Sequence, residues 1–133
     1  MEVVLDSNVL FRNLISGGNI LDLVFDNRLR IYAPLKLNDE IKNNKSEILS
    51  KSKLSKQEFD DLFSLVFEKI NWVSKENYVN HLDKSEEILA EHKKDKDFIA
   101  LCMSKQVKLW TYENRLIDTG HGITTKEISE FLS

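Results

Sequence analysis

The sequence contains few of the residues that form crosslinks and flexible linkers. Its 133 residues include one cysteine, one proline and four glycines. A single cysteine excludes an internal disulfide and suits a reducing, cytoplasmic setting. Because so little proline and glycine is present, long linkers are not expected, and we predict one folded domain over residues 1–133.

Long hydrophobic runs and a positive net charge are also absent. No apolar run approaches the roughly 18 residues of a membrane span, and the first residues lack the pattern of a signal peptide, so we expect no membrane association. The formal net charge is −3, whereas general nucleic-acid binders are usually basic. Any phosphate-rich partner must therefore be met by a local basic patch, by metal ions, or with the help of a partner protein.

Short apolar segments alternate with helical patterns along the chain. The apolar segments predict strands over residues 3–5, 30–33, 72–73, 107–110 and 121–123. The helical patterns cover residues 9–14, 20–25, 35–49, 55–70, 83–93, 95–105 and 125–132, and Thr125 is expected to cap the last of them. This alternation predicts a three-layer α/β/α fold with a central, mostly parallel sheet.

Four acidic residues occupy related places in the predicted topology. Asp6 follows the first strand, Glu40 lies near the start of the helical region after the second, Asp95 opens the helix before the fourth, and Glu113 follows the fourth. In a doubly wound sheet these positions can meet at one edge. Grouped carboxylates repel one another unless a cation lies among them, and oxygen ligands suit Mg²⁺ or Mn²⁺. The competing interpretation is that these acids are helix caps and turn residues.

Other kinds of site find little support in the sequence. The three histidines are scattered and do not have zinc-ligand spacing. The chain has no glycine-rich phosphate loop and no G-x-S-x-G nucleophile motif. Lys36, Lys42 and Lys45 share a segment with Glu40 and could form a patch that contacts phosphates, although solvated surface charges would look the same.

Four segments, taken in order, resemble motifs of the PIN domain family. Residues 3–10, Val-Val-Leu-Asp-Ser-Asn-Val-Leu, resemble the opening strand of the family and its first acid. Residues 32–41 resemble the segment that carries the second acid, residues 95–102 the helix headed by the third, and residues 109–113 the strand, threonine and acid that follow. The spacing between Asp95 and Thr111 agrees with the usual gap of the family and favours Asp95 over Asp97 as a ligand. The resemblance spans nearly the whole chain.

This resemblance implies a PIN-like fold and a metal-dependent ribonuclease that cleaves single-stranded RNA. It further implies the toxin component of a toxin–antitoxin pair, held inactive by an antitoxin protein. The implied catalytic residues and Mg²⁺ (or Mn²⁺) ligands are Asp6, Glu40, Asp95 and Glu113. The implied supporting residues are Asn8, Thr111, Asp97 and Asn114. The family usually has Asp at the fourth position, so Glu113 is a departure, and Asn114 could share its role.

Two other interpretations stay open at this point. A catalytically degenerate PIN-like module would bind RNA or a protein without cleavage, and Glu113 together with the net negative charge favours it. A receiver-like or flavodoxin-like signalling domain ranks lower, because it would need a phosphoacceptor Asp after a middle strand, whereas Asp6 follows the first. Residues 46–80 match no family motif. Their aromatic helix, residues 59–67, could supply the interface of a homodimer.

Overall fold

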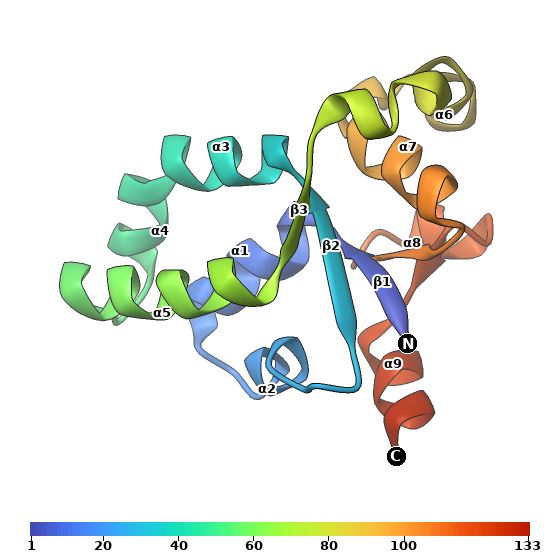
Figure 1. Cartoon of the computed structure of the whole chain (residues 1–133). Coiled ribbons are helices and arrows are strands. Elements are labelled where there is room, and N and C mark those ends of the chain that lie inside the picture. The colour runs from blue at the N-terminus through green and yellow to red at the C-terminus, as the bar shows by residue number, and fades with distance from the viewer.

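The computed structural model describes all 133 residues and contains a five-stranded, entirely parallel sheet between layers of helices (Figure 1). The strands are β1 (Glu2–Leu5), β2 (Arg30–Pro34), β3 (Asn71–Val73), β4 (Lys108–Trp110) and β5 (Gly122–Ile123). Their order in the sheet is β3-β2-β1-β4-β5. The predicted three-layer α/β/α fold is confirmed. The chain reverses its direction across the sheet between β1 and β4, which is the place where such folds build ligand sites.

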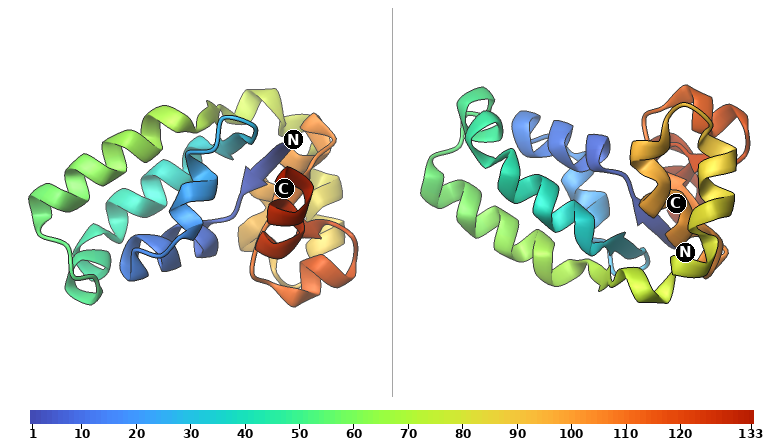
Figure 2. Two further views of the ribbon diagram at one scale, coloured as in Figure 1. Left: turned by 90° about the horizontal axis from the view of Figure 1, so that it is seen from below. Right: turned by 90° about the horizontal axis from the view of Figure 1, so that it is seen from above.

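The helices form two groups on either side of this sheet (Figure 2). One group holds α1 (Ser7–Ser16), α2 (Ile20–Val24), α3 (Leu35–Asn43), α4 (Lys45–Lys51) and α5 (Lys56–Lys69). The other holds α6 (Leu82–Leu89), α7 (Lys96–Lys105) and α8 (Asn114–Asp118), while α9 (Thr125–Leu132) lies near the N-terminus. Short 3₁₀ turns cover Lys75–Asn77, Val79–His81 and Lys93–Asp95. No helix of the chain has the length and hydrophobicity needed to cross a bilayer.

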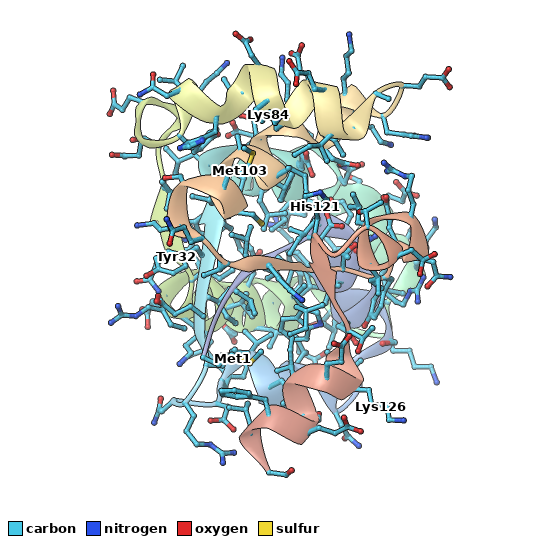
Figure 3. The ribbon with its side chains drawn as sticks, turned by 90° about the vertical axis from the view of Figure 1, so that its right-hand side faces the viewer. Met1, Tyr32, Lys84, Met103, His121 and Lys126 are labelled. Carbon is cyan, nitrogen blue, oxygen red and sulfur yellow. The ribbon has the colours of Figure 1, made fainter.

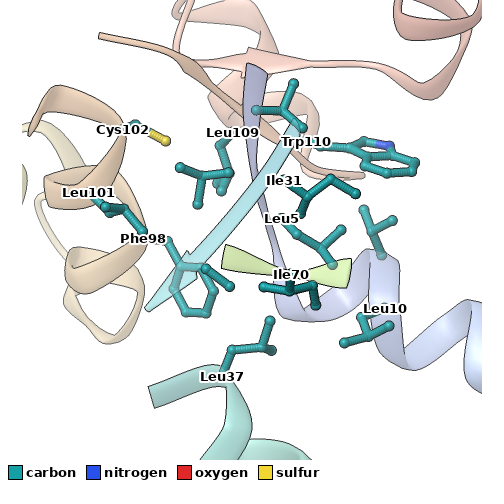
Figure 4. Close-up of a cluster of buried hydrophobic side chains, with 14 of the residues drawn as sticks. Leu5, Leu10, Ile31, Leu37, Ile70, Phe98, Leu101, Cys102, Leu109 and Trp110 are labelled. Atoms are coloured by element: carbon teal, nitrogen blue, oxygen red, sulfur yellow. The ribbon is translucent and has the colours of Figure 1, made fainter. Parts of the chain in front are cut away.

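The core is built around β1, which lies at the centre of the sheet. Val3, Val4 and Leu5 are fully buried, as expected for a strand covered on both faces. From α7, Phe98 and Leu101 pack onto the strands, where Figure 4 shows them beside Leu5, Ile31 and Leu109. At the surface, lysines such as Lys84 and Lys126 extend into solvent (Figure 3). Burial of a continuous apolar layer on both faces thus holds β1, and the residue that follows it, in place.

Two predicted helices differ from their patterns, one because it is divided and one because it ends early. The region 35–49 is divided at Asn44 into α3 and α4, and the Asn44 amide donates to the Glu40 carbonyl at 2.7 Å. The predicted helix 83–93 is α6, which begins at Leu82 and ends at Leu89 because Ala90 has φ 52°, outside the helical region. The helix α8 and the 3₁₀ turns were not predicted.

Two helices begin with a capping box. At the start of α5, the Ser55 hydroxyl accepts from the Glu58 N–H at 3.1 Å and the Glu58 carboxylate accepts from the Ser55 N–H at 3.0 Å. Thr125 was the wrong cap for α9. The cap is Thr124, whose hydroxyl accepts from the Glu127 N–H at 3.0 Å. Thr125 instead accepts a hydrogen bond from the indole of Trp110 at 2.9 Å.

Candidate active site

Asp6 is the first side chain beyond the buried strand β1, and it is 2% exposed. Its backbone N–H donates to the carbonyl of Trp110 at 3.0 Å, which ties the ends of β1 and β4 together. One carboxylate oxygen, Oδ1, accepts from the Ser7 N–H at 2.9 Å. Asp6 therefore caps α1, as the interpretation of the acids as helix caps predicted. The other, Oδ2, accepts from the Thr111 hydroxyl at 2.6 Å. This second bond joins Asp6 to the end of β4, and a helix cap alone does not require it.

Thr111 and Glu113 follow β4 on the other side of the point where the chain reverses. The Thr111 hydroxyl, buried with its residue at 1% exposure, also accepts from the Glu113 N–H at 3.1 Å. One hydroxyl therefore fixes both Asp6 and the backbone of Glu113. The Glu113 side chain turns to Arg115, whose Nη2 lies 2.7 Å from its Oε2. Behind Thr111 lies Gly122 of β5, where an added Cβ would stand 2.9 Å from the Thr111 methyl carbon.

Glu40 and Asp95 line a pocket of about 420 Å³ next to the start of α1. Glu40 is presented by α3, and Asp95 ends the 3₁₀ turn that leads into α7. Asp95 is largely buried, with 9% of its surface exposed. The polar residues that line this pocket, which we call the acidic pocket, include Asn8, Lys36, Glu40, Asn44, Lys94 and Asp95. The Lys36 ammonium donates to the carbonyl of Lys94 and so links the two walls of the pocket.

The acids are electrostatically coupled. Burial raises the pKa of Asp6 from 3.8 to about 7, the hydrogen bond from Thr111 opposes this, and the charges of Asp95 and Glu113 add to it. The pKa of Asp95 is raised by burial and by Glu113, against the opposing effects of Lys94, Lys36 and Arg115. Burial also raises the pKa of Glu40; Lys36 opposes the shift and Asp95 adds to it. Asp95 is thus coupled to each of the other three acids.

Nevertheless, no three His, Cys, Asp or Glu side chains come together as a group that could hold a metal ion. Glu113 is instead held by Arg115, whose Nη2 pairs with its carboxylate. The chemistry of the donors still fits a hard divalent cation, because they are carboxylates accompanied by a spare amide oxygen. That oxygen, Oδ1 of Asn8, is buried without a hydrogen-bond partner beside the acidic pocket. An orphaned buried acceptor of this kind is expected where a cation or a water binds.

The predicted supporting residues have different surroundings. Thr111 bonds to Asp6, whereas no hydrogen bond joins Asn8 to Asp6. Asp97 is buried and accepts from the Tyr78 hydroxyl at 2.7 Å, and it is not among the residues that line the acidic pocket. Asn114 is exposed at the start of α8. Within residues 95–97, it is therefore Asp95 that reaches the acidic pocket.

Several residues of this region escaped the sequence-based reasoning. Lys94 directly precedes Asp95, and Arg115 follows Glu113 by two residues. This proximity in the sequence was a signal that could have identified both basic residues. In contrast, no pattern indicated that the amide of Asn13 donates to the Tyr112 hydroxyl at 2.9 Å, since the two residues are 99 positions apart. The predicted patch of Lys36, Lys42 and Lys45 is smaller than expected. Lys45 pairs with Asp60 at 2.6 Å, and of the three lysines only Lys36 lines the acidic pocket.

Comparison with known proteins gives one result. A family model described as PIN domain matches residues 4–132, which include all four acids and Thr111. No curated protein matches the chain.

Proposed function

Since the chain belongs to the PIN domain family, whose members are generally nucleases, we propose that it is a Mg²⁺-dependent endoribonuclease that cleaves single-stranded RNA. One observation carries this proposal. Asp6, Asp95 and Glu113 are electrostatically coupled at the edge where β1 and β4 end, and burial raises the pKa of Asp6 to about 7. A buried carboxylate with so high a pKa is unfavourable for the fold at neutral pH, and a divalent cation would offset that cost.

In this proposal Asp6, Glu40 and Asp95 hold one or two Mg²⁺ or Mn²⁺ ions, and Glu113 completes or supports the site. When bound, such an ion lowers the pKa of a water molecule and stabilises the negative charge that develops on the phosphate. The protein contributes position and charge. Thr111 fixes the orientation of Asp6 through its 2.6 Å hydrogen bond. Lys36 and Lys94 supply positive charge at the pocket wall, where the phosphate of an RNA strand would lie.

We further propose that the protein acts in the cytoplasm as the toxin component of a toxin–antitoxin pair. The resemblance of the chain to PIN domains and its size support this assignment. Inducible expression should then arrest growth of a bacterial host. Asp6→Asn should abolish the arrest at equal protein level. Growth arrest that persists undiminished in Asp6→Asn would contradict a toxic ribonuclease.

The second candidate function is a PIN-like module that binds RNA or a protein without cleaving it. Two observations favour this alternative: Glu113 is engaged by Arg115, and no group of three acids is assembled around a common point. In that case the acids have a structural role and the protein gains little from a metal ion.

Cleavage of a labelled single-stranded RNA by the purified protein separates the two candidates. The reaction is run with Mg²⁺, with Mn²⁺ and with EDTA, for the wild type, Asp6→Asn and Asp95→Asn. Asp39→Asn is the matched control, because Asp39 is exposed on the same helix as Glu40 and lines no pocket. Metal-dependent cleavage that is lost only in the Asp6 and Asp95 variants supports the nuclease. A folded protein that neither cleaves RNA nor gains thermal stability from metal supports the binding module.

A further inference from the structure

A second pocket, of about 270 Å³, lies between the end of α6 and α8. Its floor is apolar, since Leu89 and Leu116 are buried there and Ile88 is half-buried. Its rim is polar, with His92 and Thr119 exposed. We call it the α6–α8 pocket. An apolar floor with hydrogen-bonding groups around it suits a flat ring with polar edges, such as an unstacked nucleobase.

The α6–α8 pocket and the acidic site are joined through Arg115. This residue lines the α6–α8 pocket, and its Nη2 lies 2.7 Å from the Glu113 carboxylate. Both side chains of this ion pair are about one-third exposed, at 35% for Arg115 and 33% for Glu113. The guanidinium has five N–H donors in a planar fork, so contact with one carboxylate oxygen leaves donors free for a phosphate.

The two pockets are lined in part by neighbouring residues of the chain. His92 lines the α6–α8 pocket, while Lys94 and Asp95, two and three residues later, line the acidic pocket. An RNA strand bound at the acidic pocket could therefore continue past residues 92–95 to the α6–α8 pocket. Lys94 at the acidic pocket and Arg115 at the α6–α8 pocket carry the charge that binds a polynucleotide backbone, whereas Glu91, which is exposed and also lines the α6–α8 pocket, carries the opposite charge.

The backbone just before His92 is strained. Ala90 has φ 52° and ψ −108°, a conformation that residues with a Cβ rarely adopt. It ends α6 abruptly and allows the His92 N–H to donate to the Leu89 carbonyl at 3.0 Å. Strain of this kind persists where the surrounding structure requires it, and it is concentrated at ligand sites. Here it brings His92 to the rim of the pocket.

We propose that the α6–α8 pocket is a subsite for one nucleotide of the RNA strand, with its base on the apolar floor and its phosphate on Arg115. The proposal rests on the proposed function for the identity of the ligand as single-stranded RNA. Arg115 then has two partners: it pairs with Glu113 in the free protein and contacts a phosphate in the complex. The subsite sets the position of the strand relative to Asp95.

The test measures RNA binding separately from cleavage. Affinity of the full-length Asp6→Asn protein for a short fluorescein-labelled single-stranded RNA of mixed sequence is measured by fluorescence anisotropy at several salt concentrations. Arg115→Ala, His92→Ala and Thr119→Phe are each added to this background. Arg30→Ala is the control, because Arg30 is exposed at the start of β2, away from both pockets, and carries the same charge. Circular dichroism melting confirms that each variant is folded.

Arg115→Ala should weaken binding about tenfold or more, as expected for a lost charge-assisted hydrogen bond, and it should lower the salt slope by about 0.7, as for one phosphate on a single strand. Thr119→Phe fills the pocket without a change of charge and should weaken binding roughly fivefold or more, in the range of one lost base contact. His92→Ala should weaken binding in the same direction, and Arg30→Ala should have less than about a twofold effect, as for a distant surface charge.

Equal losses in Arg115→Ala and Arg30→Ala, with no effect of Thr119→Phe, would overturn the subsite. So would an Asp6→Asn protein that binds no RNA at low salt. The same pocket substitutions are placed in the otherwise wild-type protein and assayed for cleavage in parallel. RNA cleavage with undiminished binding in all pocket variants refutes the subsite alone. Pocket-dependent binding without any cleavage by the wild type supports the subsite and refutes the nuclease.

Discussion

Replacing Asp6 by asparagine should stabilise the metal-free protein at neutral and alkaline pH. The pKa of Asp6 is raised from 3.8 to about 7, mainly by burial. Because the folded state holds the proton more tightly than the unfolded state, ionisation of Asp6 opposes folding. The penalty is absent below the ordinary pKa, grows as the pH rises toward about 7, and is complete above it. The rise of the Asp6 pKa from 3.8 to about 7 corresponds to about 4 kcal/mol in the free energy of unfolding.

Asparagine removes this penalty but also changes the hydrogen bonds. The two carboxylate oxygens accept from the Ser7 N–H and the Thr111 hydroxyl, and the single amide oxygen of asparagine can serve only one of them. Loss of one hydrogen bond to a charged group costs about 2 kcal/mol. The net gain in the free energy of unfolding is then about 2 kcal/mol at about pH 8. For a chain of this length, that gain raises Tm by roughly 6–10 °C.

The assay is thermal unfolding of wild type and Asp6→Asn in EDTA, between about pH 4 and about pH 8. The difference in Tm should be largest at the alkaline end. Near the acidic end it should reverse slightly, because the ionisation penalty has almost disappeared there while the hydrogen bond lost in asparagine is still missing. Asp39→Asn removes an exposed carboxylate from α3 and should change stability by less than about 0.5 kcal/mol at any pH. The reasoning is refuted if Asp6→Asn is less stable than wild type at the alkaline end, or if its advantage does not depend on pH.

Four further predictions follow from individual contacts. Mg²⁺ should raise the Tm of wild type in proportion to the logarithm of its excess over Kd and should raise that of Asp6→Asn much less, and equal shifts in both would exclude Asp6 from the cation site. Ala90→Gly should stabilise the fold by about 1 kcal/mol in urea titration, because glycine adopts φ 52° without strain; a loss of stability would show that Ala90 is not strained. Thr124→Ala should cost about 1 kcal/mol through the lost cap of α9, whereas Thr124→Ser should cost little, and equal losses would argue against the capping box. Gly122→Ala should destabilise by about 1–3 kcal/mol and impair metal-dependent stabilisation, since the added methyl presses on Thr111 behind Asp6; unchanged melting would mean that this region yields without strain.

The sheet was predictable because its strands carry strong local signals. Val3–Leu5, Ile31 and Leu109 belong to short apolar runs between polar turns, and these residues are buried. Helix ends were less predictable, since they depend on single residues. No feature of the sequence indicates the positive φ of Ala90, so the predicted helix 83–93 extends past the end of α6 at Leu89. At α9, two adjacent threonines offered two caps, and the contact of Thr125 with Trp110 decides between them.

The candidate site was predictable to the extent that topology places it. Asp6 was identified because it follows the first strand, and Thr111 was identified through the resemblance to the PIN domain family. The parallel pairing of β1 with β4 brings the two within hydrogen-bond distance. The orientation of each side chain was not predictable, because it depends on partners distant in sequence. The bond between Asp97 and Tyr78, 19 positions apart, is one such case, and the contact of Tyr112 with Asn13 is another. Periodicity in a single sequence indicates which residues share a face of a helix or strand. It does not indicate which side chains from distant segments form hydrogen bonds with each other.

The central position of β1 has a consequence for the synthesis of the protein. Asp6 is synthesised well before its partner Thr111, which lies 105 positions later in the chain. Until β4 has emerged and paired with β1, the Asp6 carboxylate lacks its hydroxyl partner and Glu113 is absent from the edge of the sheet. Parallel pairings between distant segments form late and slowly. The candidate site of Asp6, Thr111 and Glu113 is therefore completed only after synthesis has passed β4, however early β1 has formed.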